Sequence, residues 1–162
     1  MIEPAIALVE TNSIAAGILV GDAMVKKSVV QLLEARSICP GKYMVLIGGE
    51  VGPVKESFEV GVATAADTLV DQLLLPNVHP SVFPALMSAS LPRGDEAVGV
   101  IETVTAAICI VAADAAAKAT DVQLLEIRLA NGLGGKSFVI MGGSVADVES
   151  AVAAGVDLVG QE

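Results

Sequence analysis

Apolar residues in the first half of the chain follow two patterns, a continuous run and a helical spacing. Residues 5–11 form a continuous apolar run of the kind found in buried strands, whereas residues 13–28 carry apolar side chains at helical spacing. Asn12 or Ser13 stands where an N-cap for that helix is needed.

The following segments complete one structural unit. Proline and glycine punctuate the pattern, and between them the chain predicts strands at 30–36, 42–47 and 68–75 and helices at 51–66 and 81–87. The resulting order, βαββαβ, predicts the split-βαβ or ferredoxin-like arrangement, which belongs to the α+β class.

The second half of the chain repeats the first. Residues 5–36 align with residues 97–128 at an offset of 92, and 14 of these 32 positions are identical. The identities end in the run VQLLE, which begins at Val30 and again at Val122. An insertion of two residues then shifts the offset to 94. A repeat of this length indicates a tandem duplication.

The duplication predicts the domain boundaries. We expect domains at 1–88 and 97–162, joined by a linker at 89–96 in which small, Pro, Gly and charged residues cluster. The second copy is shorter, because Glu162 aligns with Thr68 (162 − 94 = 68), so its last strand and short helix are missing from the sequence. An unpaired strand edge is a liability. A truncation, a further tail or another covering segment would each account for this, and the sequence does not choose among them.

Composition narrows the class of protein. There are 9 basic and 19 acidic side chains, a net charge of −10, so the basic footprint of a nucleic-acid binder is missing. The mean hydropathy of +0.72 suggests a membrane protein, but the longest uncharged stretch, 72–92, contains four prolines and no other is long enough to span. Two cysteines make no disulfide framework. These features predict a soluble, cytoplasmic, acidic oligomer.

Few residues could carry chemistry, and no catalytic constellation is present. His79 has no acid, cysteine or second histidine beside it in the sequence, so we expect a loop or subunit-edge residue. Lys26 and Lys118 recur at one position of the duplication. Each follows an aspartate by four residues, so a pair on a solvated helix face is the plain interpretation, and the recurrence favours a shared contact within an assembly. Cys109 lies among apolar helix positions and is expected to be buried and inert.

Cys39 is the more informative cysteine, because it lies in a short loop, SICPGK, between two predicted strands. One thiol per chain cannot hold an iron–sulfur cluster, which requires about four thiolates. Three copies of the loop around a three-fold axis would supply three thiolates. From the residues alone, a plain loop cysteine and a shared ligand both remain open.

The repeated motifs are those of a known family. The pattern of Glu-Thr, Asp-Ala-x-x-Lys, VQLLE, a Gly-Lys after a short loop, and Gly-Gly-x-Val resembles a tandem bacterial microcompartment shell domain over essentially the whole chain. The loop that contains Cys39 is similar to that of the iron–sulfur trimeric shell proteins of propanediol-utilisation microcompartments. The resemblance implies a homotrimer that forms a flat pseudo-hexamer and tiles, with other shell proteins, into a cytoplasmic microcompartment shell. The incomplete second copy departs from this pattern and puts one set of tile contacts in doubt.

The resemblance also implies functional residues. Loops between the second and third strands line a central pore in this family, so Cys39 from three protomers would hold one [4Fe–4S] cluster per trimer, for electron transfer or cluster exchange, with a luminal redox enzyme as a further partner. The implied pore-loop residues are Ser37, Ile38, Pro40, Gly41, Asn131, Gly132, Leu133, Gly134 and Gly135. The implied tile-edge residues are Lys26, Lys118, Asn77 and His79.

Two other functions compete with this interpretation. A shell pore without a cluster would conduct small polar metabolites past the glycine-rich loop at 131–135, whose backbone N–H groups can contact a solute. A stand-alone ferredoxin-like enzyme or ligand sensor is a third candidate, and the lack of paired acids, a histidine relay or a phosphate loop disfavours it. We therefore expect a non-enzymatic structural protein.

Overall fold

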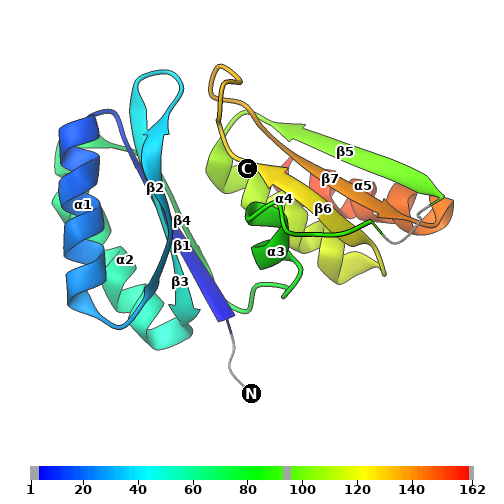
Figure 1. The fold of residues 1–162 in the computed structure, drawn as a ribbon, viewed down its shortest axis with the longest axis horizontal. Helices are drawn as coiled ribbons and strands as arrows, with labels where there is room; N and C mark the ends of the chain where they lie inside the picture. Colours follow the sequence, from blue (N-terminus) through cyan, green and yellow to red (C-terminus); the bar gives the residue numbers. More distant parts are fainter. Residues whose placement is uncertain (1–3, 93–95, 161–162) are drawn as a thin grey trace. The chain divides into compact units, whose positions relative to one another are not determined.

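The computed structural model describes residues 4–92 and 96–160. The chain divides into two compact units, residues 1–78 and residues 79–162, here called the first unit and the second unit. Each is described by itself (Figure 1).

The first unit follows the predicted element order. Its strands are β1 (Pro4–Thr11), β2 (Gln31–Ile38), β3 (Lys42–Glu50) and β4 (Leu69–Leu75), and its helices are α1 (Ile14–Lys27) and α2 (Val51–Ala65), with a short 3₁₀ turn at Ala66–Thr68. The Ser13 hydroxyl accepts a hydrogen bond from the backbone N–H of Ala16, so of the two predicted N-cap candidates Ser13 begins α1.

The first sheet has four antiparallel strands in the order β2-β3-β1-β4. Both helices cover one of its faces (Figure 1). Buried alanine, valine and methionine side chains from β1, β3, α1 and α2 form the core between the layers. The predicted split-βαβ arrangement is confirmed.

A glycine that recurs in both units explains how closely the helices approach. A Cβ atom on Gly61 of α2 would lie 2.7 Å from side-chain atoms of Met24, and one on Gly155, its counterpart, would lie 2.6 Å from Ile101 and 2.9 Å from the carbonyl oxygen of Ala112. A side chain at Gly61 would require Met24 to move, and one at Gly155 would meet the fixed backbone of Ala112, so the small residue permits the close packing.

The second unit contains the duplicated copy. Its elements are α3 (Val82–Leu86), β5 (Ala97–Thr103), α4 (Ala106–Ala119), β6 (Gln123–Arg128), β7 (Ser137–Gly143) and α5 (Val145–Val159). The strands form an antiparallel sheet in the order β5-β7-β6, with α4 and α5 on one face (Figure 1). Among the described residues no strand lies on the other side of β5.

The boundary between the units differs from the prediction. The sequence placed the end of the first domain at residue 88, whereas the structure divides the chain after Val78. The reason is that 79–92 contacts the second unit: α3 packs against β6 and α4 with Val82 and Ala85 buried, and the backbone carbonyl of Leu91 accepts a hydrogen bond from Gln123. The predicted linker at 89–96 is partly outside the described residues, because 93–95 are not described.

Candidate functional site

The hairpin that joins β2 to β3 carries the candidate ligand. Ile38 and Lys42 form the last pair of the ladder, and Cys39, Pro40 and Gly41 make the turn. The Cys39–Pro40 peptide is cis, and Gly41 has φ +66°, a conformation that favours glycine. Cys39 is a free, half-buried thiol between the buried Ile38 and the exposed Pro40 and Gly41. The structure therefore places the predicted residues Ser37 to Gly41 side by side at the end of the β2–β3 hairpin, with Ser37 and Ile38 in β2 and the other three in the turn; this end is called here the Cys39 hairpin.

A buried ion pair fixes the base of the Cys39 hairpin. Lys42 Nζ lies 2.6 Å from Glu10 Oε2, and these side chains are 18% and 1% exposed. Because a buried carboxylate needs a partner, this pair ties the start of β3 to β1 directly beside the turn. The other oxygen of Glu10, Oε1, is buried and has no hydrogen-bond partner among the described residues. The role of Glu10 was not predicted, although its recurrence as Glu102 is visible in the duplication.

The corresponding loop of the second unit is longer and has no thiol. Residues 129–136 connect β6 to β7, against only 39–41 between β2 and β3. Gly132, Gly134 and Gly135 all have positive φ, as does Ala130, whose backbone N–H donates to the hydroxyl of Ser137. The predicted loop residues Asn131 to Gly135 thus share one connection, with Asn131, Gly132 and Gly134 exposed, Leu133 half-buried and Gly135 buried.

The two cysteines have different environments, as predicted. Cys109 is buried in α4, and burial raises the pKa of its thiol to about 12, while a hydrogen bond with Thr103 acts in the opposite direction. A thiol with that pKa stays protonated and unreactive near neutral pH. Cys39 is the accessible cysteine of the chain.

The predicted edge residues occupy two kinds of environment. Lys26 forms an exposed pair with Asp22 at 2.7 Å on α1, and Asn77 lies in an exposed turn with φ 56°. Lys118 and His79 come together in the second unit, because both bind Asp114. Lys118 Nζ lies 2.6 Å from Oδ2, and the backbone N–H of His79 donates to Oδ1 at 2.7 Å.

Asp114 is a structural residue of this edge that was not predicted. It is buried, whereas its counterpart Asp22 is exposed, because the segment that leads into α3 passes over Asp114. His79 Nδ1 lies 2.7 Å from the hydroxyl of Ser81 and accepts from the Ser81 backbone N–H, so His79 fixes the start of α3.

Other kinds of site receive no support from the described part of the chain. It contains no cluster of three or more His, Cys, Asp or Glu side chains that could bind a metal ion within a single chain. Its helices include none that is both long and apolar enough to cross a bilayer.

Comparisons with known proteins agree with this geometry. The family model described as the BMC domain matches residues 5–78 and 97–162. The bacterial microcompartment shell protein PduT of Citrobacter freundii is 43% identical over 98% of this chain and 86% of its own length. The carboxysome assembly protein CcmO of Synechocystis is 31% identical over 95% of this chain and 56% of its own length.

Solved structures show the same fold. A microcompartment protein from Desulfitobacterium hafniense superposes with a TM-score of 0.93 and 52% identity, covering 98% of this chain and 88% of that chain. A fused permuted hexameric shell protein from the RMM microcompartment superposes with a TM-score of 0.65 at 23% identity, covering 98% and 84%, which supports the fold alone.

Proposed function

We propose a redox role within the family to which this chain belongs, the BMC-domain proteins of bacterial microcompartment shells. The chain is a structural shell component similar to PduT. In the proposed assembly three chains, each with two copies of the domain, form a pseudo-hexameric tile, and their three Cys39 thiolates hold one [4Fe–4S] cluster on the three-fold axis.

The position of Cys39 carries the proposal. Its thiol is accessible at the tip of a hairpin held at its base by the Lys42–Glu10 pair, and glycine and proline leave the turn without bulky neighbouring side chains. A short, anchored turn presents a thiolate in a defined direction, as a ligand shared among symmetric copies requires.

The residues present fit a shared cluster better than a cluster within one chain. The described residues of one chain offer no metal-binding cluster, and the other cysteine, Cys109, is buried in a different unit. Three-fold symmetry would supply three equivalent thiolates, the ligand type that iron–sulfur clusters prefer, and leave one iron for an exogenous ligand. When bound, such a cluster supplies one-electron transfer, and its open iron suits exchange across the shell. A luminal redox enzyme is the corresponding partner.

A parallel test of both cysteines examines the proposal. Anaerobically purified and reconstituted parent protein is expected to be brown and to contain about four irons and four acid-labile sulfides per three chains. Cys39→Ser should lose both iron and colour yet keep the mass of the parent assembly in analytical ultracentrifugation. Cys109→Ala is the matched control and should keep the cluster. A colourless parent after reconstitution, or a Cys39→Ser protein with the iron content of the parent, contradicts the proposal.

A metabolite pore without a cluster is the second candidate. The observation in its favour is the run of positive-φ glycines at 132, 134 and 135, since such backbone conformations can direct N–H groups toward a small anion or polar solute. A colourless protein whose lack of iron and sulfide persists under anaerobic reconstitution would favour this candidate over the cluster.

A further inference from the structure

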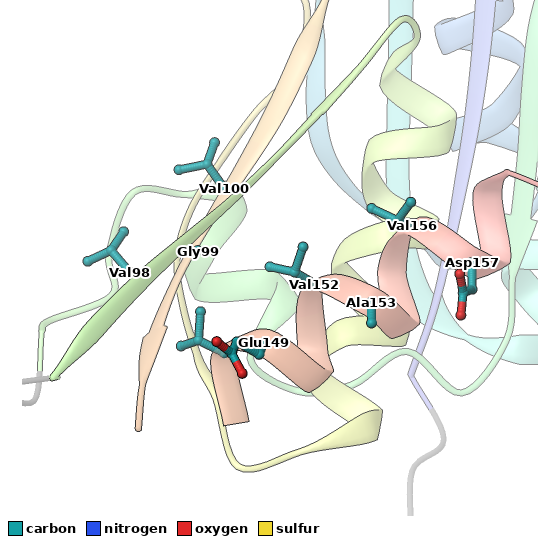
Figure 2. Close-up of a pocket in the computed structure, with 9 residues that line it drawn as sticks. Val98, Gly99, Val100, Glu149, Val152, Ala153, Val156 and Asp157 are labelled. Atoms are coloured by element: carbon teal, nitrogen blue, oxygen red, sulfur yellow. The ribbon is translucent and has the colours of Figure 1, made fainter. Parts of the chain in front are cut away.

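A pocket of the second unit lies between β5 and α5 and is lined mainly by valine side chains (Figure 2). The described residues that line it include two carboxylates, Glu149 and Asp157, but no thiol, hydroxyl, imidazole or amide side chain. This lining suggests no covalent chemistry. The loop between β6 and β7 does, because it contains Asn131 and Gly132 in succession.

Asn131 differs from the other asparagines of the chain in the residue that follows it. Asn12 precedes a serine and Asn77 a valine, whereas Asn131 precedes Gly132. The side-chain amide of an asparagine is open to attack by the backbone nitrogen of the next residue, and glycine has no side chain to obstruct that approach. The fold decides whether this reaction proceeds, because hydrogen bonds can hold the two groups apart.

Hydrogen bonds hold the loop between β6 and β7 near both of its ends. The backbone N–H of Ala130 donates to the hydroxyl of Ser137 at 3.1 Å, and that of Lys136 donates to a carbonyl oxygen within the loop at 3.2 Å. In the described part of the chain, neither the side-chain amide of Asn131 nor the N–H of Gly132 has a hydrogen-bond partner. The two reacting groups therefore lie in the unrestrained part of an anchored loop.

The space around Gly132 is open as well. A Cβ atom placed on Gly132 would have no neighbouring atom within 4 Å, and the residue has φ +72°, which glycine adopts at little cost. Asn131 is exposed. The backbone nitrogen of Gly132 can therefore approach the side chain of Asn131 without displacing another residue.

The other asparagines lack this combination. Asn77 is exposed, but the N–H of Val78 donates to a carbonyl oxygen of β1 at 2.9 Å, and the branched side chain of Val78 crowds the same nitrogen. Asn12 is also exposed, but it precedes Ser13, whose carbonyl and hydroxyl oxygens both accept hydrogen bonds at the start of α1. Exposure is common to all three sites, so the free and unobstructed N–H distinguishes Gly132.

We propose that Asn131 is a site of spontaneous covalent modification that yields aspartate and isoaspartate. The backbone nitrogen of Gly132 attacks the side-chain carbonyl carbon of Asn131 and gives up its proton. The new C–N bond closes a succinimide ring, and the side-chain nitrogen leaves with that proton as ammonia. Water then opens the ring. Cleavage of the new bond gives aspartate, and cleavage of the original peptide bond gives isoaspartate. No atom is oxidised or reduced, and water is the only co-reactant.

The modification changes the charge of the loop. It adds one negative charge to a chain whose net charge is −10. The new carboxylate lies beside the positive-φ glycines, whose N–H groups are suited to a small anion. In the trimer proposed above, three loops would place three carboxylates around one opening and disfavour anions there. This consequence rests on the proposed function, whereas the modification itself does not.

Peptide mapping of the folded full chain tests the proposal. Trypsin places each asparagine in a separate peptide, and Asn131 lies in LANGLGGK, residues 129–136. During incubation at mildly alkaline pH this peptide should gain about 1 Da and separate into two products, while the peptide that contains Asn77 stays unchanged. The rate should be within about ten-fold of that of synthetic LANGLGGK, because a segment without hydrogen bonds needs little local opening. A sample digested at time zero corrects for modification during digestion.

Two glycine variants separate the attacking N–H from the conformation of the loop. Gly132 and Gly134 have similar φ values, +72° and +64°, and a Cβ atom would meet nothing within 4 Å at either. Gly132→Ala puts a methyl group beside the attacking nitrogen and should slow the conversion at least about ten-fold, whereas Gly134→Ala, with comparable backbone strain, should change the rate less than about two-fold.

Three results would overturn the proposal. The first is a folded chain without mass gain at Asn131 under conditions that convert the synthetic peptide. The second is equal slowing in Gly132→Ala and Gly134→Ala, and the third is aspartate without isoaspartate, which indicates direct hydrolysis by water. The assay uses cluster-free protein and measures mass, so its result is the same whether or not Cys39 binds a cluster, and failure of either proposal leaves the other standing.

Discussion

At the scale of single residues, the duplication places the same ion pair in two environments. Glu10–Lys42 is largely buried, whereas Glu102–Lys136, also at 2.6 Å, is 63% and 56% exposed. Glu10→Gln leaves a partly buried lysine without its partner and should lower the free energy of unfolding by roughly 2 kcal/mol, less than a fully buried pair because Lys42 keeps some solvent. Glu102→Gln should cost about 0–1 kcal/mol. Urea unfolding of the two variants measures both losses of unfolding free energy. Equal losses would show that burial of the ion pair does not change its contribution to stability.

The second residue-scale prediction concerns pH. The pKa of Cys109 is raised from 9.0 to about 12 in the folded protein, so the unfolded chain releases this proton at lower pH than the folded one. The contribution of Cys109 to stability is therefore complete below pH 9 and is lost as pH rises toward 12, by up to about 1.4 kcal/mol per pH unit.

Comparison with Cys109→Ala isolates this effect from the titration of lysine and tyrosine. Between pH 8 and 11 the unfolding free energy of the parent should fall more steeply than that of the variant, whatever their difference at pH 7. If the unfolding free energies of the parent and of Cys109→Ala fall in parallel with pH, the burial of Cys109 is contradicted. In native, cluster-free protein near pH 8, Ellman's reagent should modify one cysteine, Cys39, and should modify both only after unfolding.

At the scale of elements, α3 depends on one buried carboxylate. Asp114 holds the backbone of His79 and the ammonium group of Lys118, so Asp114→Ala removes the anchor from the segment that precedes α3. Amide hydrogen exchange should become faster across 79–88, and limited proteolysis should cut there first. Asp22→Ala, the same substitution in the exposed copy, is the control and should leave exchange in α1 nearly unchanged. Equal protection of 79–88 in the parent and in Asp114→Ala would refute this role.

The elements also show what the sequence could predict. Apolar periodicity and the Ser13 cap were sufficient for the first unit, because each element buries a regular face against its neighbours. The repeat then located the strands and helices of the second copy. The structure divides the chain earlier than the predicted end of the first domain, because α3 follows β4 in the sequence yet packs on β6 and α4, and periodicity carries no information about which unit an element joins.

The sequence predicted the loop of the candidate site but not the contacts that hold it. The composition of SICPGK indicated a tight turn with an accessible thiol, and both are present. The Glu10–Lys42 clamp joins residues that are 32 positions apart, and Asp114 contacts His79 from 35 positions away. Such contacts depend on tertiary structure. The only sign of them in the sequence is that Glu10 and Lys42 recur as Glu102 and Lys136, and Asp114 as Asp22, in the other copy.

At the scale of the whole molecule, charge opposes the assembly that the apolar surface favours. The chain carries a net charge of −10 together with a mean hydropathy of +0.72. If the chains assemble into the proposed tiles, the net charge makes the tiles repel one another. The repulsion is strong at 0.01 M salt, where the screening length is about 30 Å, and weak at 1 M salt, where it is about 3 Å. Raising the salt concentration should therefore promote sheets or tubes of the shell protein.

Light scattering and negative-stain electron microscopy across about 0.01–1 M NaCl measure this effect, with sucrose of matched osmolality as the uncharged control. If ordered sheets grow with salt and not with sucrose, electrostatic repulsion between the chains is the force that opposes assembly. Dissolution of sheets by salt would instead mean that ion pairs across the tile edges hold them together. Lys26, whose pair with Asp22 is exposed and open to competition from a neighbouring tile, would then be the first residue to neutralise.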